Sequence, residues 1–153
     1  TSVVLFVIAA SSSFSWLITS ARIADTVTRG MMAISSSPFV LIFLINVLLL
    51  FLGTFLETQA IILLVAPILI PLAARIGLDP LALGIIMVVN TSVGMITPPM
   101  AVNLFVACGV ADLKIEEISK PILPLLAVEI AFCLFMSNFP QMLTWLPRLI
   151  HGF

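Results

Sequence analysis

The chain has 153 residues, of which 62% are hydrophobic and only 8% are charged, and its mean hydropathy is +1.34. Because a soluble domain carries roughly a quarter charged residues, this composition excludes a protein that covers its surface with polar groups in water. The single histidine excludes a histidine-based metal cluster, and the net charge of −1 points to no partner; we expect no nucleic acid to bind. Cys108 and Cys133 lie in apolar runs and are expected to be buried thiols rather than a disulfide.

Charged residues are confined to a few short segments. The stretches 1–21, 30–56, 58–74 and 80–111 carry none, and 121–147 carries only Glu129. About 20 apolar residues cross a bilayer as a helix, whereas the strands of a membrane barrel are shorter and alternate in polarity. We therefore predict an all-α integral membrane protein with a single membrane domain over the whole chain.

A first membrane helix is predicted over 1–21 and an amphipathic arm helix over 22–37. Ile23, Val27 and Met31 fall on one face of the arm helix, which suits the membrane surface. The first stretch lacks the basic leader of a signal peptide and precedes further apolar runs, so we interpret it as a spanning helix. The missing initiator methionine leads us to expect a longer polypeptide, of which this is the back part.

Residues 38–76 form a predicted hairpin of two apolar arms. The connection between the arms is short and half apolar, with Glu57 as its one acid, whereas a connection outside the membrane is normally polar. Two interpretations remain open for it: a tight transmembrane hairpin, or a re-entrant hairpin whose tip ends inside the membrane beside a cavity. Pro67 and Pro71 should kink the second arm, and Gly77 is expected to cap it.

The next apolar run, 81–111, is predicted to be a broken helix. At about 1.5 Å per residue, a straight helix of this length would exceed a hydrocarbon core of about 30 Å. Pro98 and Pro99 remove two backbone donors, and Pro98 disfavours helical geometry at Thr97. A charged linker over 112–120, a last membrane helix over 121–138 and an interfacial tail over 139–153, with Trp145 and Arg148, are expected to follow.

A helix that breaks inside a membrane exposes carbonyls at one end and amides at the other. Such a break persists when these groups bind something, since each costs several kcal/mol unpaired in lipid. Exposed carbonyls suit Na⁺ and exposed amides suit a carboxylate. The simpler interpretation is a proline kink with polar residues packed between helices. The double proline and the second interruption at Gly53 favour a binding site. Its candidate residues are Gly53, Thr54, Glu57, Thr58, Asn90, Ser92, Gly94, Thr97, Pro98, Pro99 and Asn103. We expect Na⁺ to be held by Gly53, Asn90, Gly94 and Thr97.

Several short segments occur together and in a specific order. They are Gly53–Glu57 (GTFLE), Ala66–Pro71 (APILIP), Gly77–Pro80 (GLDP), Gly84–Ile86 (GII), Asn90, Gly94–Pro99 (GMITPP) and Asn103–Val106 (NLFV). This ordered set resembles the C-terminal portion of the large, DctM-like membrane subunit of tripartite ATP-independent periplasmic (TRAP) transporters. Thr58 stands where that family often has proline, and Ala101 where glycine is common.

The resemblance implies a secondary transporter, not an enzyme, in a bacterial or archaeal inner membrane. The family imports C4-dicarboxylates, sialic acid and other organic acids on a sodium gradient. A periplasmic binding protein delivers the substrate, and a small membrane subunit helps to form the scaffold. The large subunit has two inverted halves, each with an arm helix, a hairpin and a broken helix, and works by an elevator motion; this chain matches the second half. No cofactor is implied beyond the coupling ion.

The residues also bear on rival functions and on the orientation of the chain in the membrane. A structural membrane subunit without transport activity is the main alternative; an intramembrane enzyme lacks a catalytic constellation, and a channel lacks a filter or charged ring. Glu129, inside the last span, is a candidate functional acid or a residue paired across a helix interface. The four arginines fall on one side and the two lysines on the other. The positive-inside rule places the arginines in the cytoplasm, but the family pattern, which we follow, places them in the periplasm.

Overall fold

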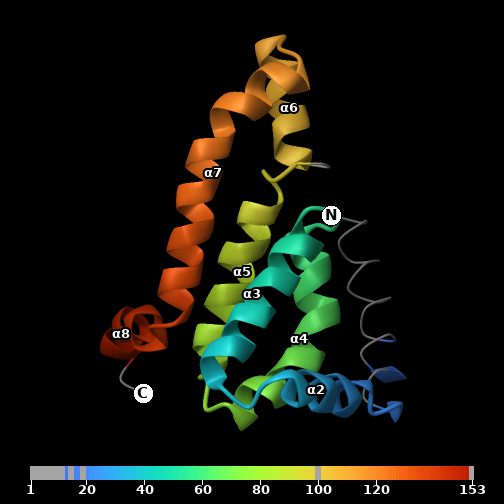
Figure 1. Ribbon diagram of the computed structural model, residues 1–153, viewed down its shortest axis with the longest axis vertical. Helices are drawn as coiled ribbons and strands as arrows, with labels where there is room; N and C mark the ends of the chain where they lie inside the picture. Colours follow the sequence, from blue (N-terminus) through green and yellow to red (C-terminus); the bar gives the residue numbers. More distant parts are fainter. Residues whose placement is uncertain (1–12, 14–15, 18–19, 99–100, 152–153) are drawn as a thin grey trace.

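The computed structural model describes residues 13, 16–17, 20–98 and 101–151, and this part of the chain is helical, without strands (Figure 1). Its helices are α2 (Ile23–Ile34), α3 (Pro38–Gly53), α4 (Thr58–Arg75), α5 (Pro80–Gly94), α6 (Val102–Ala111), α7 (Ile115–Ser137) and α8 (Pro140–His151). The all-α prediction is confirmed. The predicted helix over 1–21 lies mostly outside the described residues, as does Pro99.

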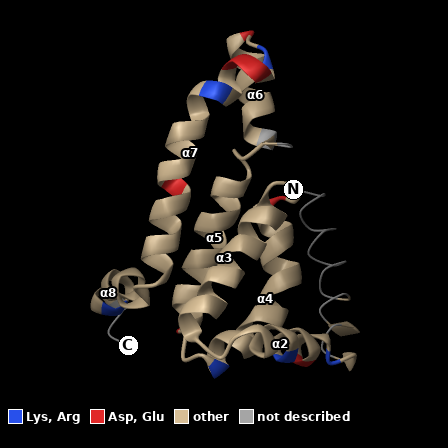
Figure 2. Cartoon of the chain, viewed as in Figure 1, with Lys and Arg blue, Asp and Glu red and all other residues tan. Residues whose placement is uncertain are grey.

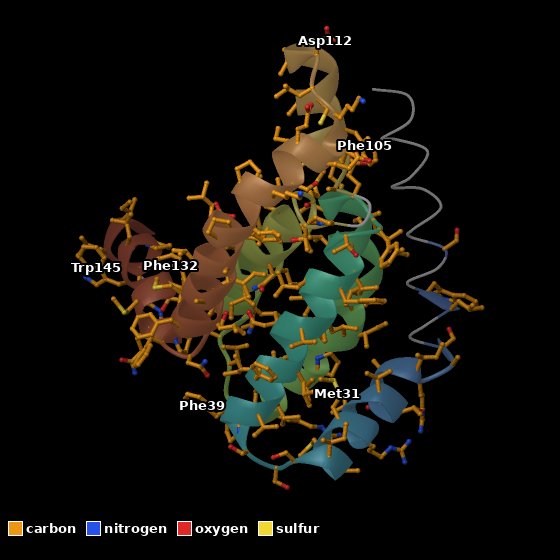
Figure 3. All side chains as sticks on the ribbon, turned by 45° about the horizontal axis from the view of Figure 1, so that its top comes forward. Met31, Phe39, Phe105, Asp112, Phe132 and Trp145 are labelled. Carbon is orange, nitrogen blue, oxygen red and sulfur yellow. The ribbon has the colours of Figure 1, made fainter. Side chains whose placement is uncertain are left out.

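Apolar surface and charge are distributed as a membrane requires. Among the described helices, α4 and α7 are long and apolar enough to cross a bilayer, while α3 and α5 are shorter apolar helices. Most charged side chains gather at the two ends of the molecule; the exceptions are two acids, one at the hairpin tip and one midway along α7 (Figure 2), which the sequence identifies as Glu57 and Glu129. Between the ends, large apolar side chains such as Phe39, Phe105 and Phe132 are exposed on the outside (Figure 3).

The hairpin α3–α4 and the broken helix α5–α6 stand side by side on a common base. Helix α2 lies across that base, and α3, α4 and α5 extend away from it, so the hairpin tip ends level with the break between α5 and α6 (Figure 1). Helix α6 and the first part of α7 extend beyond the tip. The hairpin is thus shorter than the molecule, which is the geometry expected of a re-entrant hairpin.

The core fills the space between α3, α4 and α5, where side chains from all three helices are buried. Its members are Leu41, Ile45 and Leu49 from α3, Ile61, Leu69 and Leu72 from α4, and Leu83, Ile86 and Met87 from α5. Helix α4 continues through Pro67 and Pro71 as one element. The turn after it follows the predicted pattern, since Gly77 has a φ of 71° and the amide of Leu78 donates to the carbonyl of Ala73.

The last long helix begins earlier than the sequence indicates. Residues 112–120 were expected to be a linker and 121–138 a span, but α7 starts at Ile115 and runs through Pro121 and Pro124. The reason is local capping, because the Glu117 carboxylate accepts a hydrogen bond of 2.9 Å from the amide of Lys114. The prolines are therefore inside the helix rather than at its start.

A buried polar pair joins α7 to the hairpin. The Ser137 hydroxyl lies 2.8 Å from the side-chain oxygen of Asn46 on α3 and 2.7 Å from the carbonyl of Cys133, and shares its one proton between them. The amide nitrogen of Asn46 donates to the carbonyl of Ile42 at 2.7 Å, which fixes the orientation of the side chain. Both side chains are almost completely buried, so the pair selects the position of α7 against α3.

Replacing Ser137 with alanine leaves the buried oxygen of Asn46 without a donor. We expect the unfolding free energy of the complete subunit in detergent to fall by about 1 kcal/mol, the scale of a side-chain hydrogen bond between membrane helices. The control is a double-mutant cycle with Asn46→Leu, measured by denaturant titration. Equal costs of Ser137→Ala in the wild-type and Asn46→Leu backgrounds would contradict the pairing.

A second polar link lies at the base, where α8 meets the α4–α5 turn. Arg148 on α8 forms a salt bridge with Asp79, whose carboxylate also accepts a hydrogen bond of 2.8 Å from the amide of Leu81 and so caps α5. The hydrogen bond from Leu81, and after it the interaction with Arg148, holds the pKa of Asp79 below its ordinary value of 3.8. One carboxylate therefore fixes both the start of α5 and the position of α8.

This arrangement predicts a pH dependence with a defined sign. A carboxylate whose pKa is lowered by folding stabilises the folded state fully above the unfolded pKa, and that stabilisation is lost as the pH falls below 3.8. We expect the Tm of Asp79→Asn to lie below that of the wild type at pH 7, and the difference to shrink as the pH falls below 3.8 and through the lowered pKa of Asp79 in the folded protein. Asp25→Asn is the control, since Asp25 forms no salt bridge within the described residues. A Tm difference independent of pH would contradict the assignment.

Candidate functional site

The hairpin tip touches the helix break through two glycines. An added Cβ on Gly94 would lie 2.6 Å from the Cα of Gly53, and one on Gly53 would lie 2.9 Å from the carbonyl oxygen of Thr91. Both distances are far shorter than any Cβ contact and both involve backbone atoms, which cannot turn away. We call this approach of Gly53 to Thr91 and Gly94 the tip–break contact; it exists because neither glycine carries a side chain.

Two helix C-termini meet at the tip–break contact. Helices α3 and α5 start at the same base and end at Gly53 and Gly94, so their carbonyl ends lie together (Figure 1). Each helix carries about half a negative charge at its C-terminus. Two such ends in contact repel each other, and the negative potential between them favours a cation.

Unpaired carbonyl oxygens surround this contact. Within the described residues, no backbone amide donates to the carbonyls of residues 53–56 at the tip or to those of Ile96 and Thr97 in the break. Other hydrogen bonds hold the chain at the break, among them one from the amide of Thr97 to the carbonyl of Gly94 and one from the amide of Asn103 to the carbonyl of Met95. The region therefore offers several backbone oxygens, the ligand type that Na⁺ prefers.

The start of α4 presents unpaired amide groups, with partial positive charge, next to these carbonyls. In the described part of the chain, the amides of Thr58, Gln59 and Ala60 have no hydrogen-bond acceptor, and no side chain caps this end of the helix. The Thr58 hydroxyl lies 3.4 Å from the sulfur of Met95, which places the start of α4 beside the break. Exposed amides and the positive end of a helix dipole suit an anion such as a carboxylate.

The hydroxyl groups near the contact donate hydrogen bonds to backbone carbonyls of the helices that they follow. Thr54 donates to the carbonyl of Phe51 at 2.7 Å and Thr97 to that of Val93 at 2.8 Å. A hydroxyl that donates in this way keeps its lone pairs for another partner. Thr54 and Thr97 are therefore fitted to accept from a donor or coordinate a cation.

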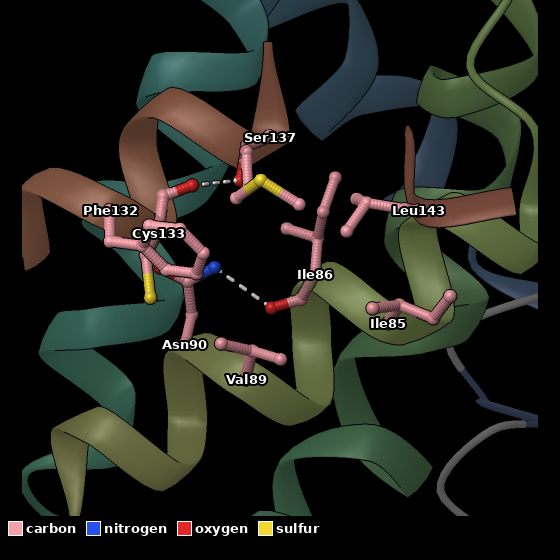
Figure 4. A pocket seen from close by; sticks show the side chains of 9 residues that line it. Ile85, Ile86, Val89, Asn90, Phe132, Cys133, Ser137 and Leu143 are labelled. Atoms are coloured by element: carbon pink, nitrogen blue, oxygen red, sulfur yellow. Dashed lines mark hydrogen bonds between the residues drawn. The ribbon is translucent and has the colours of Figure 1, made fainter. Parts of the chain in front are cut away.

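Asn90 lies apart from the tip–break contact. Its amide nitrogen donates to the carbonyl of Ile86 at 2.8 Å, and its side chain lines a cavity of about 60 Å³ between α5 and α7, beside Cys133 and Ser137 (Figure 4). The side-chain oxygen of Asn90 is buried and has no hydrogen-bond partner among the described residues. The residue that faces Gly53 in its place is Thr91, one position further along α5.

The remaining candidate residues are spread around the site. Ser92 is exposed and lines an open hollow with Glu129, Glu57 is exposed at the tip, and Asn103 is exposed at the start of α6. Pro98 is half-buried in the break. Sequence reasoning missed the roles of Thr91 and Met95. The helical period places both Asn90 and Thr91 on the side of Gly94, four and three residues before it, and so does not choose between them.

The sequence as a whole matches known proteins over nearly its full length. A family model described as "Tripartite ATP-independent periplasmic transporter, DctM component" matches residues 1–142. The chain belongs to this family. The resemblance found in the sequence is thereby confirmed, and the protein is a membrane protein of a transporter family rather than an enzyme.

Individual DctM relatives carry names that refer to different substrates. The chain is 41% identical over 137 residues to the isethionate TRAP transporter permease protein DctMQ of Oleidesulfovibrio alaskensis. This match covers 90% of the chain and 22% of the relative. It is 37% identical to the C4-dicarboxylate large permease protein DctM of Vibrio cholerae, over 99% of the chain and 34% of the relative. The sialic acid large permease protein SiaM of Vibrio cholerae is 35% identical over 100% of the chain and 36% of its own length. The chain thus spans about a third of these relatives or less.

The tip–break contact predicts that Gly94 tolerates no side chain. Gly94→Ala should push α3 away from α5 and cost about 1–3 kcal/mol of stability in the complete DctM subunit, the range for overpacking a close contact. Gly84→Ala is the matched control on the same helix, since an added Cβ there meets nothing within 4 Å, and it should be neutral or stabilising by up to about 1 kcal/mol. Thermal unfolding of both variants provides the measurement, and equal Tm values would contradict the contact.

Proposed function

We propose that this chain forms one half of the substrate and sodium site in the large membrane subunit of a sodium-coupled importer of organic acids. The observation that carries the proposal is the tip–break contact, in which two helix C-termini and one helix N-terminus converge without a surface loop. In transporters with inverted repeats, discontinuous helices of this kind hold substrate and ions near the membrane midplane.

The sodium part of the proposal rests on oxygens and partial charges. The C-termini of α3 and α5 supply negative potential, and the backbone around Gly53 and Gly94 supplies unpaired carbonyls. The hydroxyl of Thr97 adds a side-chain oxygen whose proton is already donated to Val93. Asn90 belongs to the proposed site only if its side chain turns from the cavity beside α7, so Thr97 is the better test of the ion.

The substrate part rests on the start of α4. The one basic residue in helices α3, α4, α5 and α6 is Arg75, at the end of α4 away from the hairpin tip. The chain therefore meets an anion at the tip with amides, hydroxyls and a bound cation. The three relatives are named for isethionate, C4-dicarboxylates and sialic acid, which share an acidic group and little else. We therefore assign an organic anion to this site without choosing among them.

The partners follow from the family. We propose that a periplasmic binding protein delivers the organic acid and that a small membrane subunit completes the scaffold in the inner membrane of the cell. The chain covers only about a third of its relatives, so the other hairpin and the other half of the site belong to the remaining two thirds of the subunit.

Thr97→Ala tests the sodium assignment. Removing one of a few oxygens should weaken sodium binding by about 1–3 kcal/mol, which raises the sodium concentration for half-maximal uptake about tenfold. Thr97→Ser keeps the hydroxyl and should be much milder. The measurement is uptake of the organic acid against sodium concentration in proteoliposomes that hold the complete complex and its binding protein.

Two further results decide the proposal. Asn90→Ala at normal expression reports whether the neighbouring cavity takes part, since a shift equal to that of Thr97→Ala would add Asn90 to the ion site. If Thr97→Ala leaves the sodium curve unmoved, the sodium assignment is wrong and the double proline is a kink. A complex that carries no substrate at any sodium concentration would favour the structural subunit instead.

A further inference from the structure

Three arginines surround one open hollow at the base of the molecule. Arg22 precedes α2 as its N-cap residue, Arg29 lies in α2 and Arg75 lies at the end of α4; with Asp25 they line a hollow of about 300 Å³. All three arginines are exposed. We call this feature the arginine hollow.

The positive charge of the arginine hollow is not neutralised within the described residues. None of its three arginines forms a salt bridge there; Arg29 donates only to the backbone carbonyl of Asp25, at 3.3 Å. The nearby carboxylate of Asp79 is engaged by Arg148. Three guanidinium groups therefore face a single carboxylate.

The surroundings of the arginine hollow are amphipathic. Helix α2 lies across the ends of the membrane helices (Figures 1 and 2), and on its inner side Thr28 is buried and Met31 packs against the core. Large apolar side chains close to the hollow in sequence are exposed, among them Trp16 at 71% and Ile23 at 37%. A ligand that fits both features carries negative charge at one end and hydrocarbon at the other.

We propose that the arginine hollow binds the phosphate of an anionic phospholipid. Guanidinium groups hold phosphate oxygens in pairs of parallel hydrogen bonds, and the acyl chains would lie along the exposed apolar side chains beside α2. The opposite end of the molecule has no such excess of positive charge, since Lys114 and Lys120 are accompanied there by Asp112, Glu116 and Glu117. Of the two ends that the described residues form, the arginine end combines excess positive charge with an amphipathic helix that lies across the other helices.

This site is separate from the proposed transport site. The hollow lies at the base of the hairpin, whereas Gly53 and Gly94 lie at its tip (Figure 1). The two proposals can therefore be tested separately: lipid binding at the base can be disproved while sodium-coupled uptake is upheld, and the reverse is also possible. A second candidate occupant, an acidic surface of a periplasmic protein, needs the charge but leaves the exposed apolar side chains unused.

The test is native mass spectrometry of the complete subunit with its membrane partner in detergent. Phosphatidylglycerol is titrated against phosphatidylcholine, and the triple variant R22Q/R29Q/R75Q is compared with the wild type. Each arginine near a lipid headgroup strengthens anionic binding about fivefold, so the triple variant should bind phosphatidylglycerol on the order of 100-fold more weakly. Its affinity for phosphatidylcholine should be unchanged. The matched control is K114Q/K120Q, which should behave as the wild type.

The other outcomes each decide the proposal. Equal retention of phosphatidylglycerol by the triple variant and the wild type overturns it, as does equal binding of the two lipids by the wild type. Inorganic phosphate that displaces phosphatidylglycerol completely at equal concentration shows a site for the free anion and overturns the lipid assignment. A triple variant that keeps its lipid but loses binding of the periplasmic protein shows a protein-docking surface instead. R22K/R29K/R75K, which keeps the charges, separates lost binding from misfolding and should retain most of the phosphatidylglycerol affinity.

Discussion

The structure depends on one constraint, that backbone polar groups inside a membrane need partners. Helices α3 and α5 end next to each other, and the chain around each end has backbone carbonyls that receive no amide hydrogen bond among the described residues. It places the two ends together through Gly53 and Gly94, a contact that only two residues without side chains permit. The same junction brings the free amides of α4 beside Met95. The unpaired backbone groups of three helix ends are thus gathered in one place.

Much of the fold was predictable because its signals are local. Proline at the start of α3 and α5, glycine after α4 and the double proline after Thr97 each restrict the backbone of their own neighbours. These signals placed the hairpin, the surface turn and the break. The start of α7 differs from the prediction because the charged residues 112–120 indicate a linker. The hydrogen bond from the Lys114 amide to Glu117, which starts the helix, depends on a side-chain conformation that a sequence pattern does not display.

The site was predictable in its parts but not in its rotation. Gly53, Gly94 and Thr97 stood out by residue type, and the structure brings Gly53 and Gly94 into contact. Asn90 also stood out by type, yet it faces α7 and Thr91 faces Gly53. Which side of α5 meets the hairpin is set by the packing of α3, α5 and α7, including the buried pair Asn46–Ser137. The rotation of α5 therefore depends on contacts between helices, which a single sequence does not show.

The charge distribution ties the proposed ion and substrate to each other. The region around the tip–break contact has negative helix ends from α3 and α5 and a positive one from α4, with no basic side chain nearby to hold an anion permanently. A cation bound between the carbonyl ends would add a full positive charge next to the amides of Thr58 and Gln59, and so strengthen the binding of an anion there. Linkage makes this effect reciprocal, so the anion must strengthen the cation by the same factor. A Thr58→Lys substitution would remove this mutual dependence, because the lysine would let the anion bind without the cation. In the proposed site, the absence of a basic side chain around the tip–break contact would therefore make binding of the anion depend on the bound cation.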